Sequence, residues 1–186
     1  MQDIFMCRLR IQSMKDAFIQ ANPRAEYGIS AAVRHNKLYS PATTNRQRRM
    51  IRDYWKALLD ELGEKYDQPQ TTEVFFADIL ELQRRMNDQF DELFCDDGFK
   101  VSHAQKSISV YLKTRWCLNE IPTPPLCPVD STVLNLLGRP WNNHPWTRMS
   151  FEEYQHATLE ISRRAALAGL SVAVWELILF NNRQDV

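Results

Sequence analysis

The chain lacks the features that mark membrane, disordered and collagen-like proteins. Its longest nearly apolar run, Leu170 to Phe180, is 11 residues long and contains Glu176, whereas a membrane-spanning helix needs about 20 residues. Glycine and proline number only 5 and 9 among 186 residues, and 44% of the residues are hydrophobic, which is a globular composition. We therefore expect one compact domain over residues 1–186, with candidate sub-lobes 1–97 and 98–186.

The sequence also lacks paired cysteines and an N-terminal targeting signal. Cys7, Cys95, Cys117 and Cys127 lie far apart without a C-x-x-C pair, which argues against a zinc ribbon or a disulfide framework and favours ordinary buried thiols. Asp3 stands where a secretory signal would carry bases, and no long apolar core follows. We expect a cytoplasmic protein with no metal, no cofactor and no membrane partner.

No segment alternates between apolar and polar residues over several positions, and no internal repeat is present. Apolar residues instead recur at three- and four-residue steps in every long segment, which predicts helices. The expected helices cover residues 4–21, 25–36, 43–62, 71–94, 103–119, 128–137, 150–168 and 171–180. The sequence thus predicts an all-α fold of about seven or eight helices.

Residues 101–138 are the most unusual part of the sequence. Ser102 is expected to cap a helix whose inward face would leave Lys106 and Lys113 on the other face. Residues 121–128 form a proline-rich connector, and each proline fixes φ and keeps its predecessor out of the helical region. Pro128 is expected in the first turn of the next helix. The stiffness of the connector would hold Asp130 in one place.

The net charge is zero, but the charge is unevenly distributed. Residues 1–60 carry a net charge of +6, residues 61–100 of −7 and residues 101–186 of +1. The bases are densest at Arg46, Arg48, Arg49 and Arg52, a cluster that could meet phosphates. The alternative is that this cluster is the solvated face of one helix, paired with the acidic helix that follows.

Several familiar catalytic signatures are absent: the Gly-rich phosphate loop, H-E-x-x-H, G-x-S-x-G and the dinucleotide fingerprint. What remains is a helix that begins A-Q-K-S-I-S-V-Y-L-K, an extended linker, P-V-D-S-T-V-L and then L-G. This order, over residues 98–138, resembles the catalytic segment of the helix-hairpin-helix DNA glycosylases of the endonuclease III superfamily.

The resemblance implies roles for two residues. By motif, Lys106 matches the lysine that forms a Schiff base with the sugar in bifunctional members, and Asp130 matches the catalytic aspartate. The resemblance therefore implies a DNA partner, cleavage of an N-glycosidic bond, and a lyase step through this pair. The chain departs from the family in four respects. It has no glycine between Lys100 and His103, a lysine-to-aspartate separation of 24 residues, Thr132 where the family motif has a histidine, and no iron–sulfur cysteine cluster.

An enzyme that extrudes a base needs aromatic surfaces for stacking and basic groups for the DNA backbone. Trp141 and Trp146 lie in an Asn- and Pro-rich loop and are candidates for base stacking, with a packing or lid role as the alternative. Lys113 and Arg115 are candidates for contacts with the nucleic-acid backbone. The histidines have no metal-ligand spacing.

Other interpretations of the same residues stay open. Asp130 is also suited to cap a helix, Lys106 to be an exposed helical lysine, and the two are either both catalytic or neither is. A non-catalytic helical module would bind nucleic acid or a protein through residues 34–52. A third hypothesis is a protein-interaction domain with an acidic face over residues 78–97. Convergence of the Lys106 amine and the Asp130 carboxylate in one cleft would favour catalysis.

Overall fold

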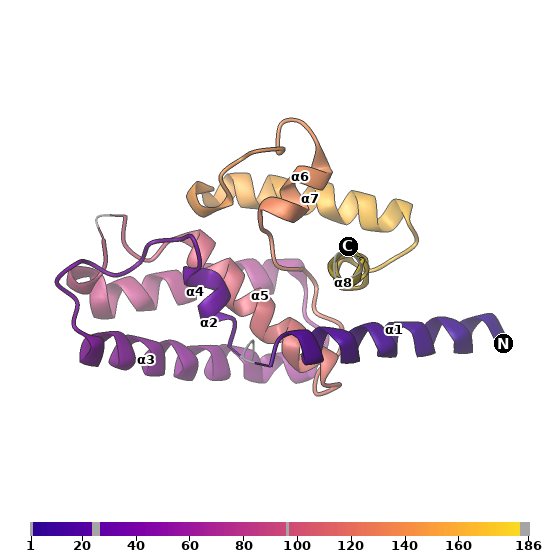
Figure 1. Ribbon diagram of the computed structural model, residues 1–186, viewed down its shortest axis with the longest axis horizontal. Helices are drawn as coiled ribbons and strands as arrows, with labels where there is room; N and C mark the ends of the chain where they lie inside the picture. The colour runs from indigo at the N-terminus through magenta and orange to yellow at the C-terminus, as the bar shows by residue number, and fades with distance from the viewer. Residues whose placement is uncertain (1, 24–26, 96, 183–186) are drawn as a thin grey trace.

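The computed structural model describes residues 2–23, 27–95 and 97–182, with side chains from residue 9 onward. In this part of the chain the fold is all-α, as predicted, with 69% of residues in helices and no strand. The helices are α1 (Gln2–Ala21), α2 (Ile29–Val33), α3 (Asn45–Gly63), α4 (Thr72–Phe90), α5 (Val101–Cys117), α6 (Ser131–Leu137), α7 (Phe151–Leu167) and α8 (Val172–Asn181). Figure 1 shows their arrangement.

Helices α3 and α4 lie side by side and have the amphipathic pattern that the sequence predicts (Figure 1). Thr44 and Gln47 form a capping box at the start of α3, and Thr71 caps α4. Helix α4 ends at Phe90, because a short 3₁₀ turn, η2 (Asp91–Leu93), replaces the expected helix up to residue 94. These two helices bury one face each and leave most of their charges outside. Asp78 of α4 is the exception, because it is buried and accepts from Lys65 and from the Tyr66 hydroxyl.

Helix α5 is buried on every side. It packs against α1, α2, α3 and α4, and all its residues except Arg115 are buried. Most of its polar side chains are hydrogen-bonded within the core, as buried polar groups usually are. Ser107 accepts from Trp55 Nε1 at 3.1 Å and donates to His103 O at 3.0 Å. The first helix of the expected second sub-lobe is therefore the central helix of the molecule.

A glycine allows α2 to lie close to α5. Gly28, just before α2, has φ +62°, and a Cβ built there would lie 2.6 Å from Ser107 O. A side chain at this position would be strained by its own backbone and would clash with α5. The expected helix over residues 25–36 is shorter than predicted, Ile29–Val33, and residues 24–26 lie outside the described part of the chain.

The starts of α5 and α6 also differ from the prediction. Helix α5 begins at Val101, with Lys100 rather than Ser102 in the capping position. Ser102 instead accepts from Asn36 Nδ2 and donates to Thr147 O, which ties two loops to α5. Helix α6 begins at Ser131, so Pro128 lies in the extended connector and not in the first helical turn.

Helices α1 and α8 pack against each other and close one side of α5 (Figure 1). The rings of Phe18 and Phe180 meet edge to face, with centroids 5.1 Å apart. Lys15 Nζ donates to Trp116 O and to Asn119 Oδ1, both at 2.9 Å. This lysine thus caps the C-terminal end of α5, where the helix dipole favours a cation, although burial lowers its pKa.

Among the described helices, none alone has the length and apolar character to cross a membrane, and only α7 and α8 taken together, bent by 84°, pass that test.

Candidate functional site

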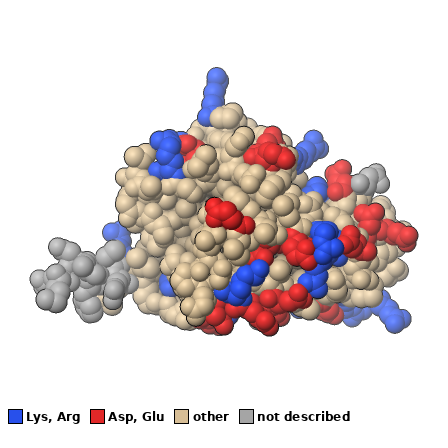
Figure 2. All heavy atoms as spheres, turned by 180° about the vertical axis from the view of Figure 1, so that it is seen from behind, with Lys and Arg blue, Asp and Glu red and all other residues tan. Residues whose placement is uncertain are grey.

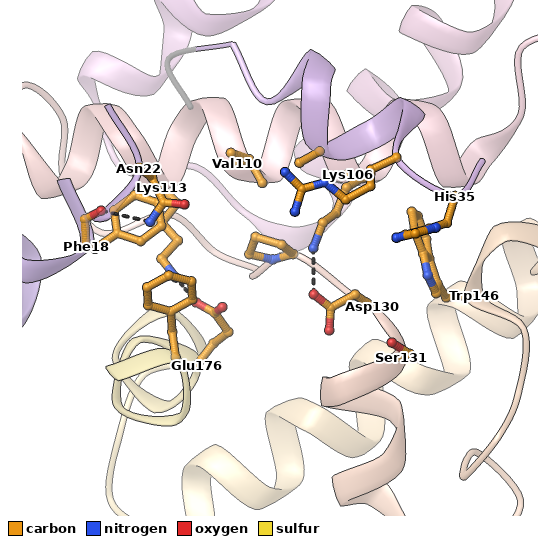
Figure 3. Close-up of a pocket in the computed structure, with 14 residues that line it drawn as sticks. Phe18, Asn22, His35, Lys106, Val110, Lys113, Asp130, Ser131, Trp146 and Glu176 are labelled. Atoms are coloured by element: carbon orange, nitrogen blue, oxygen red, sulfur yellow. Dashed lines mark hydrogen bonds and ion pairs between the residues drawn. The ribbon is translucent and has the colours of Figure 1, made fainter. Parts of the chain in front are cut away.

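Lys106 and Asp130 meet in a pocket of about 290 Å³. Lys106 Nζ donates to Asp130 Oδ2 at 2.8 Å. The Lys106 side chain is 11% exposed and that of Asp130 is 32% exposed, so the pair is mostly shielded from water yet lines an open space (Figure 3). The structure therefore brings the two candidate catalytic residues together, and Lys106 is a buried lysine rather than an exposed one.

Gln105 places Asp130 beside Lys106. Its Nε2 donates to Val129 O at 2.8 Å, and Val129 N donates to its Oε1 at 3.2 Å. These two bonds fix the extended chain against α5 one residue before Asp130. The proline-rich connector supplies stiffness, but the side-chain amide of Gln105 determines where the connector lies on α5.

Asp130 has two tasks, one for each oxygen. Its Oδ1 accepts from Thr132 N at 3.0 Å and from Val133 N at 3.2 Å, as the N-cap of α6. Its Oδ2 meets Lys106. The structure thus confirms Asp130 as a helix cap and also places its other oxygen against Lys106. The cap also orients the carboxylate, because it fixes one oxygen on the backbone.

A second ion pair closes the other end of the pocket (Figure 3). Lys113 Nζ lies 2.5 Å from Glu176 Oε2, and the two side chains are only 5% and 10% exposed. The same amine lies 4.3 Å from the ring centroid of Phe18 and 4.5 Å from that of Phe180. Lys113 is thus held by a carboxylate and by two aromatic faces.

Basic and aromatic side chains line the pocket beside Lys106. Arg34 and His35, which follow α2, line it together with Trp146 from the 3₁₀ turn η3 (Trp146–Arg148). Lys106 Nζ lies 5.9 Å from the Trp146 ring centroid. Figure 3 shows His35, Trp146, Lys106 and Asp130 at one end and Lys113 with Glu176 at the other. Cationic side chains outnumber carboxylates around this space, which favours a ligand with negative charge.

Two further predicted site residues lie outside the pocket. Trp141 lines a separate hollow beside α7 with Arg139 and Leu159. Arg115 donates to Gly63 O at 3.0 Å and to Asp67 Oδ1 at 3.0 Å, and so ties the end of α5 to the end of α3. Lys113 does line the pocket, but its amine faces Glu176. Trp146 is therefore the one of the two predicted tryptophans that the structure brings to Lys106.

The arginine cluster of α3 does not line the pocket either. Arg46, Arg49 and Arg52 are exposed, and Arg48 is half-buried. Arg48 lies over the Tyr39 ring, 5.1 Å from its centroid, and Arg52 Nε donates to the Tyr39 hydroxyl at 3.4 Å. On the face that Figure 2 shows, acidic and basic side chains intermingle rather than separate.

Burial controls the titration of groups near the pocket. His103, one turn before Lys106, has its pKa lowered to about 4 because burial disfavours the charged ring. Its Nδ1 accepts from Lys100 N at 3.1 Å, which fits a neutral ring. Burial raises the pKa of the Cys127 thiol well above its usual value, which makes it unreactive. In the described residues no group of three or more His, Cys, Asp or Glu side chains is placed to hold a metal ion.

Sequence reasoning missed Glu176, His35 and Gln105 as parts of the site. Glu176 had a visible signal, because it is the acid inside the otherwise apolar run from residue 170 to residue 180, and an acid in such a run needs a buried partner. Gln105 had none, whereas His35 belongs to the basic segment over residues 34–52 that the sequence offers for phosphate contacts. Gln105 acts through the backbone of a distant segment, and His35 reaches the pocket only because Gly28 lets its segment approach α5.

No family model, no curated protein and no solved structure matches this chain. The assignment of a function therefore rests on the geometry of the pocket.

Proposed function

We propose that this protein acts on DNA as a base-excision enzyme, with Lys106 and Asp130 as its catalytic pair. The observation that carries the proposal is the 2.8 Å contact between these two side chains in a pocket. They were paired from the order of motifs alone, across 24 residues and a proline-rich connector. A buried lysine next to an open space, with a neighbouring base that can take its proton, fits amine catalysis.

The chemistry assigns a separate role to each residue. When the N-glycosidic bond breaks, the base leaves with the electron pair and takes up a proton, and positive charge develops on the sugar. The Asp130 carboxylate stabilises that charge. The amine of Lys106, after giving a proton to a base such as the neighbouring carboxylate, forms a bond from its nitrogen to C1′. Opening of the sugar ring then gives a Schiff base, from which strand cleavage follows.

The pocket walls support this substrate class. Trp146 offers an aromatic face next to Lys106, and stacking on such a face compensates for the loss of stacking in the duplex. Arg34 and His35 also line the pocket, and their cationic side chains could meet a nucleotide's phosphate.

Borohydride trapping tests the proposal. Duplex oligonucleotides with an abasic site, uracil, or oxidised or alkylated bases are incubated with the protein, and borohydride reduces any Schiff base to a stable covalent adduct. We expect an adduct that is lost in Lys106→Gln. Asp130→Asn should lose base release and stay folded, because asparagine also caps helices. Both variants are checked by circular dichroism.

Lys56→Gln is the matched control, because Lys56 is exposed on α3 and does not line the pocket. This variant should form the adduct as the wild type does. If the wild type releases no base and forms no adduct on any of these substrates, the proposal is wrong.

A second candidate is a non-catalytic module that binds nucleic acid or a protein through residues 34–52. The exposed position of Arg46 and Arg49 at the start of α3 favours it. Replacing Arg46, Arg48, Arg49 and Arg52 with glutamine should then weaken DNA binding and flatten its salt dependence. Unchanged affinity in low salt would exclude this surface.

A further inference from the structure

A second hollow lies next to the Lys106 pocket, and half of its described lining residues are Lys, Arg or His. It has a volume of about 360 Å³, and Lys37, Lys100, Arg148 and His35 are among the side chains around it. These residues come from three separate segments: the loop after α2, the residue before α5, and the end of η3. The sequence does not reveal this cluster, because its members are up to 113 residues apart.

Hydrogen bonds to α5 fix the two loops that form this hollow. Asn36 Nδ2 donates to Ser102 Oγ at 3.0 Å, and Ser102 Oγ donates to Thr147 O at 3.1 Å. Asn36 is buried. The two loops that carry Lys37 and Arg148 are thereby tied to the first turn of α5. The cations are consequently presented by a fixed support.

The hollow has an excess of positive charge. Asp97 is the carboxylate among its described lining residues, and its Oδ2 lies 3.7 Å from Lys100 Nζ. Within the described part of the chain, Lys37 and Arg148 have no ion pair within 4.0 Å. Two exposed cations and one weakly paired cation therefore face the same space, which is the electrostatic arrangement that binds phosphate groups.

The hollow and the Lys106 pocket share a wall. His35 lines both spaces, and Trp146 of the pocket belongs to the same 3₁₀ turn as Arg148 of the hollow. A single strand of nucleic acid with one nucleotide in the pocket would therefore run its neighbouring phosphates past the hollow.

We propose that the hollow formed by Lys37, Lys100 and Arg148 binds the phosphates of the DNA strand that flank the nucleotide in the Lys106 pocket. This inference rests on the proposed function for the identity of the strand. It assigns backbone binding to these three residues rather than to Lys113 and Arg115, whose charges already have partners inside the protein.

The experiment measures DNA binding separately from catalysis. The probe is a fluorescein-labelled DNA duplex with one tetrahydrofuran abasic-site analogue, which has no base to release. Its affinity is measured by fluorescence anisotropy at several salt concentrations. The test variant is Lys37→Gln with Arg148→Gln. The control is Arg84→Gln with Arg163→Gln, which removes the same charge from side chains 59% and 60% exposed on α4 and α7.

We expect the test variant to bind about tenfold more weakly or worse in low salt, and the slope of log affinity against log salt to fall by about 1.8, since each lost phosphate contact contributes about 0.9. The control variant should match the wild type. Equal weakening of both variants, an unchanged slope in the test variant, or no binding of the probe by the wild type would each overturn the inference.

Base release from damaged duplexes, measured in parallel, separates the two proposals. Base release that survives while the slope is unchanged overturns the phosphate hollow alone. A reduced slope in the test variant without any base release by the wild type overturns the enzymatic function, and the hollow then stands as a DNA-binding site.

Discussion

The two ends of the pocket carry the same kind of ion pair in different surroundings. Lys106 and Lys113 lie seven residues apart on α5, and each faces a carboxylate from a later segment. Both pairs line the pocket, but the Lys113 pair lies between Phe18 and Phe180 and is only 5% and 10% exposed, whereas the Lys106 pair lies beside Trp146 and is 11% and 32% exposed. Two lysines on one helix therefore differ in their exposure to solvent, because different side chains pack over them.

This difference indicates which pair is structural. A buried ion pair contributes to stability only as long as both partners are present, because either charge alone would be buried without compensation. A more exposed pair beside a cavity can exchange its partner for a ligand, which is the property expected of a functional site. The following predictions test that distinction, beginning with the largest effect.

Removal of Lys113 should produce the largest loss of stability. Lys113→Met leaves the Glu176 carboxylate almost fully buried without a cation, and the free energy of unfolding should fall by about 3–5 kcal/mol. Lys106→Met should cost only about 1 kcal/mol, because Asp130 keeps contact with water and with two backbone N–H groups. Urea denaturation measures both values.

The double variant Lys113→Met with Glu176→Leu is the control for the Lys113 end. It removes both charges, and should recover most of the stability that Lys113→Met alone loses. Equal losses for Lys106→Met and Lys113→Met would contradict the distinction between the two ends.

Acid should destabilise the protein through His103, a buried residue in the first turn of α5. Its pKa of about 4 in the folded protein lies below the value of about 6.5 in an unfolded chain, so the unfolded state binds the proton first. The contribution of this group is complete above pH 6.5 and declines by about 3 kcal/mol as the pH falls to about 4. Urea denaturation across this range measures the decline.

His103→Gln isolates the effect from that of the carboxylates. The difference in unfolding free energy between the wild type and this variant should become smaller as the pH falls from 6.5 to 4. A difference that is constant with pH would show that His103 takes up its proton equally in both states.

The smallest effect concerns the two tasks of Asp130. Asp130→Ala removes both the cap and the ion pair, and should lower the free energy of unfolding by about 1–2 kcal/mol. Asp130→Asn keeps an acceptor for Thr132 N and Val133 N, and should cost less than about 1 kcal/mol. Thermal denaturation ranks the three proteins. If alanine and asparagine are equally destabilising, the cap is not what holds the start of α6.

Local sequence signals were sufficient for most helices but not for the faces of α5. Thr44, Thr71 and Ser150 cap helices as their residue types predict, and the apolar stripes of α3 and α4 face the core. In α5, however, Lys106 and Lys113 were assigned to an outer face and are buried. The reason is that α1, α2 and α8 cover that face, and no local pattern reports contacts with such distant segments.

In the candidate site, too, local sequence predicts some features and tertiary contacts determine the others. The motif order predicts Lys106 and Asp130 as a pair, and the two side chains are in contact, whereas their catalytic role stays a prediction. Trp141 and Trp146 could not be distinguished by sequence, since both lie in one loop and only the path of that loop takes Trp146 to the pocket. The hollow around Lys37 and Arg148 depends wholly on tertiary structure.

The contact between Phe18 and Phe180 has a consequence for the order of folding. It closes a loop of about 160 residues, and contacts between such remote parts of a chain form late because of their entropic cost. A partly folded chain in which α3, α4 and α5 have assembled would therefore have Lys106 in place but no enclosing wall around Lys113. The pocket that Lys106 lines is therefore complete only after α1 and α8 have packed against each other.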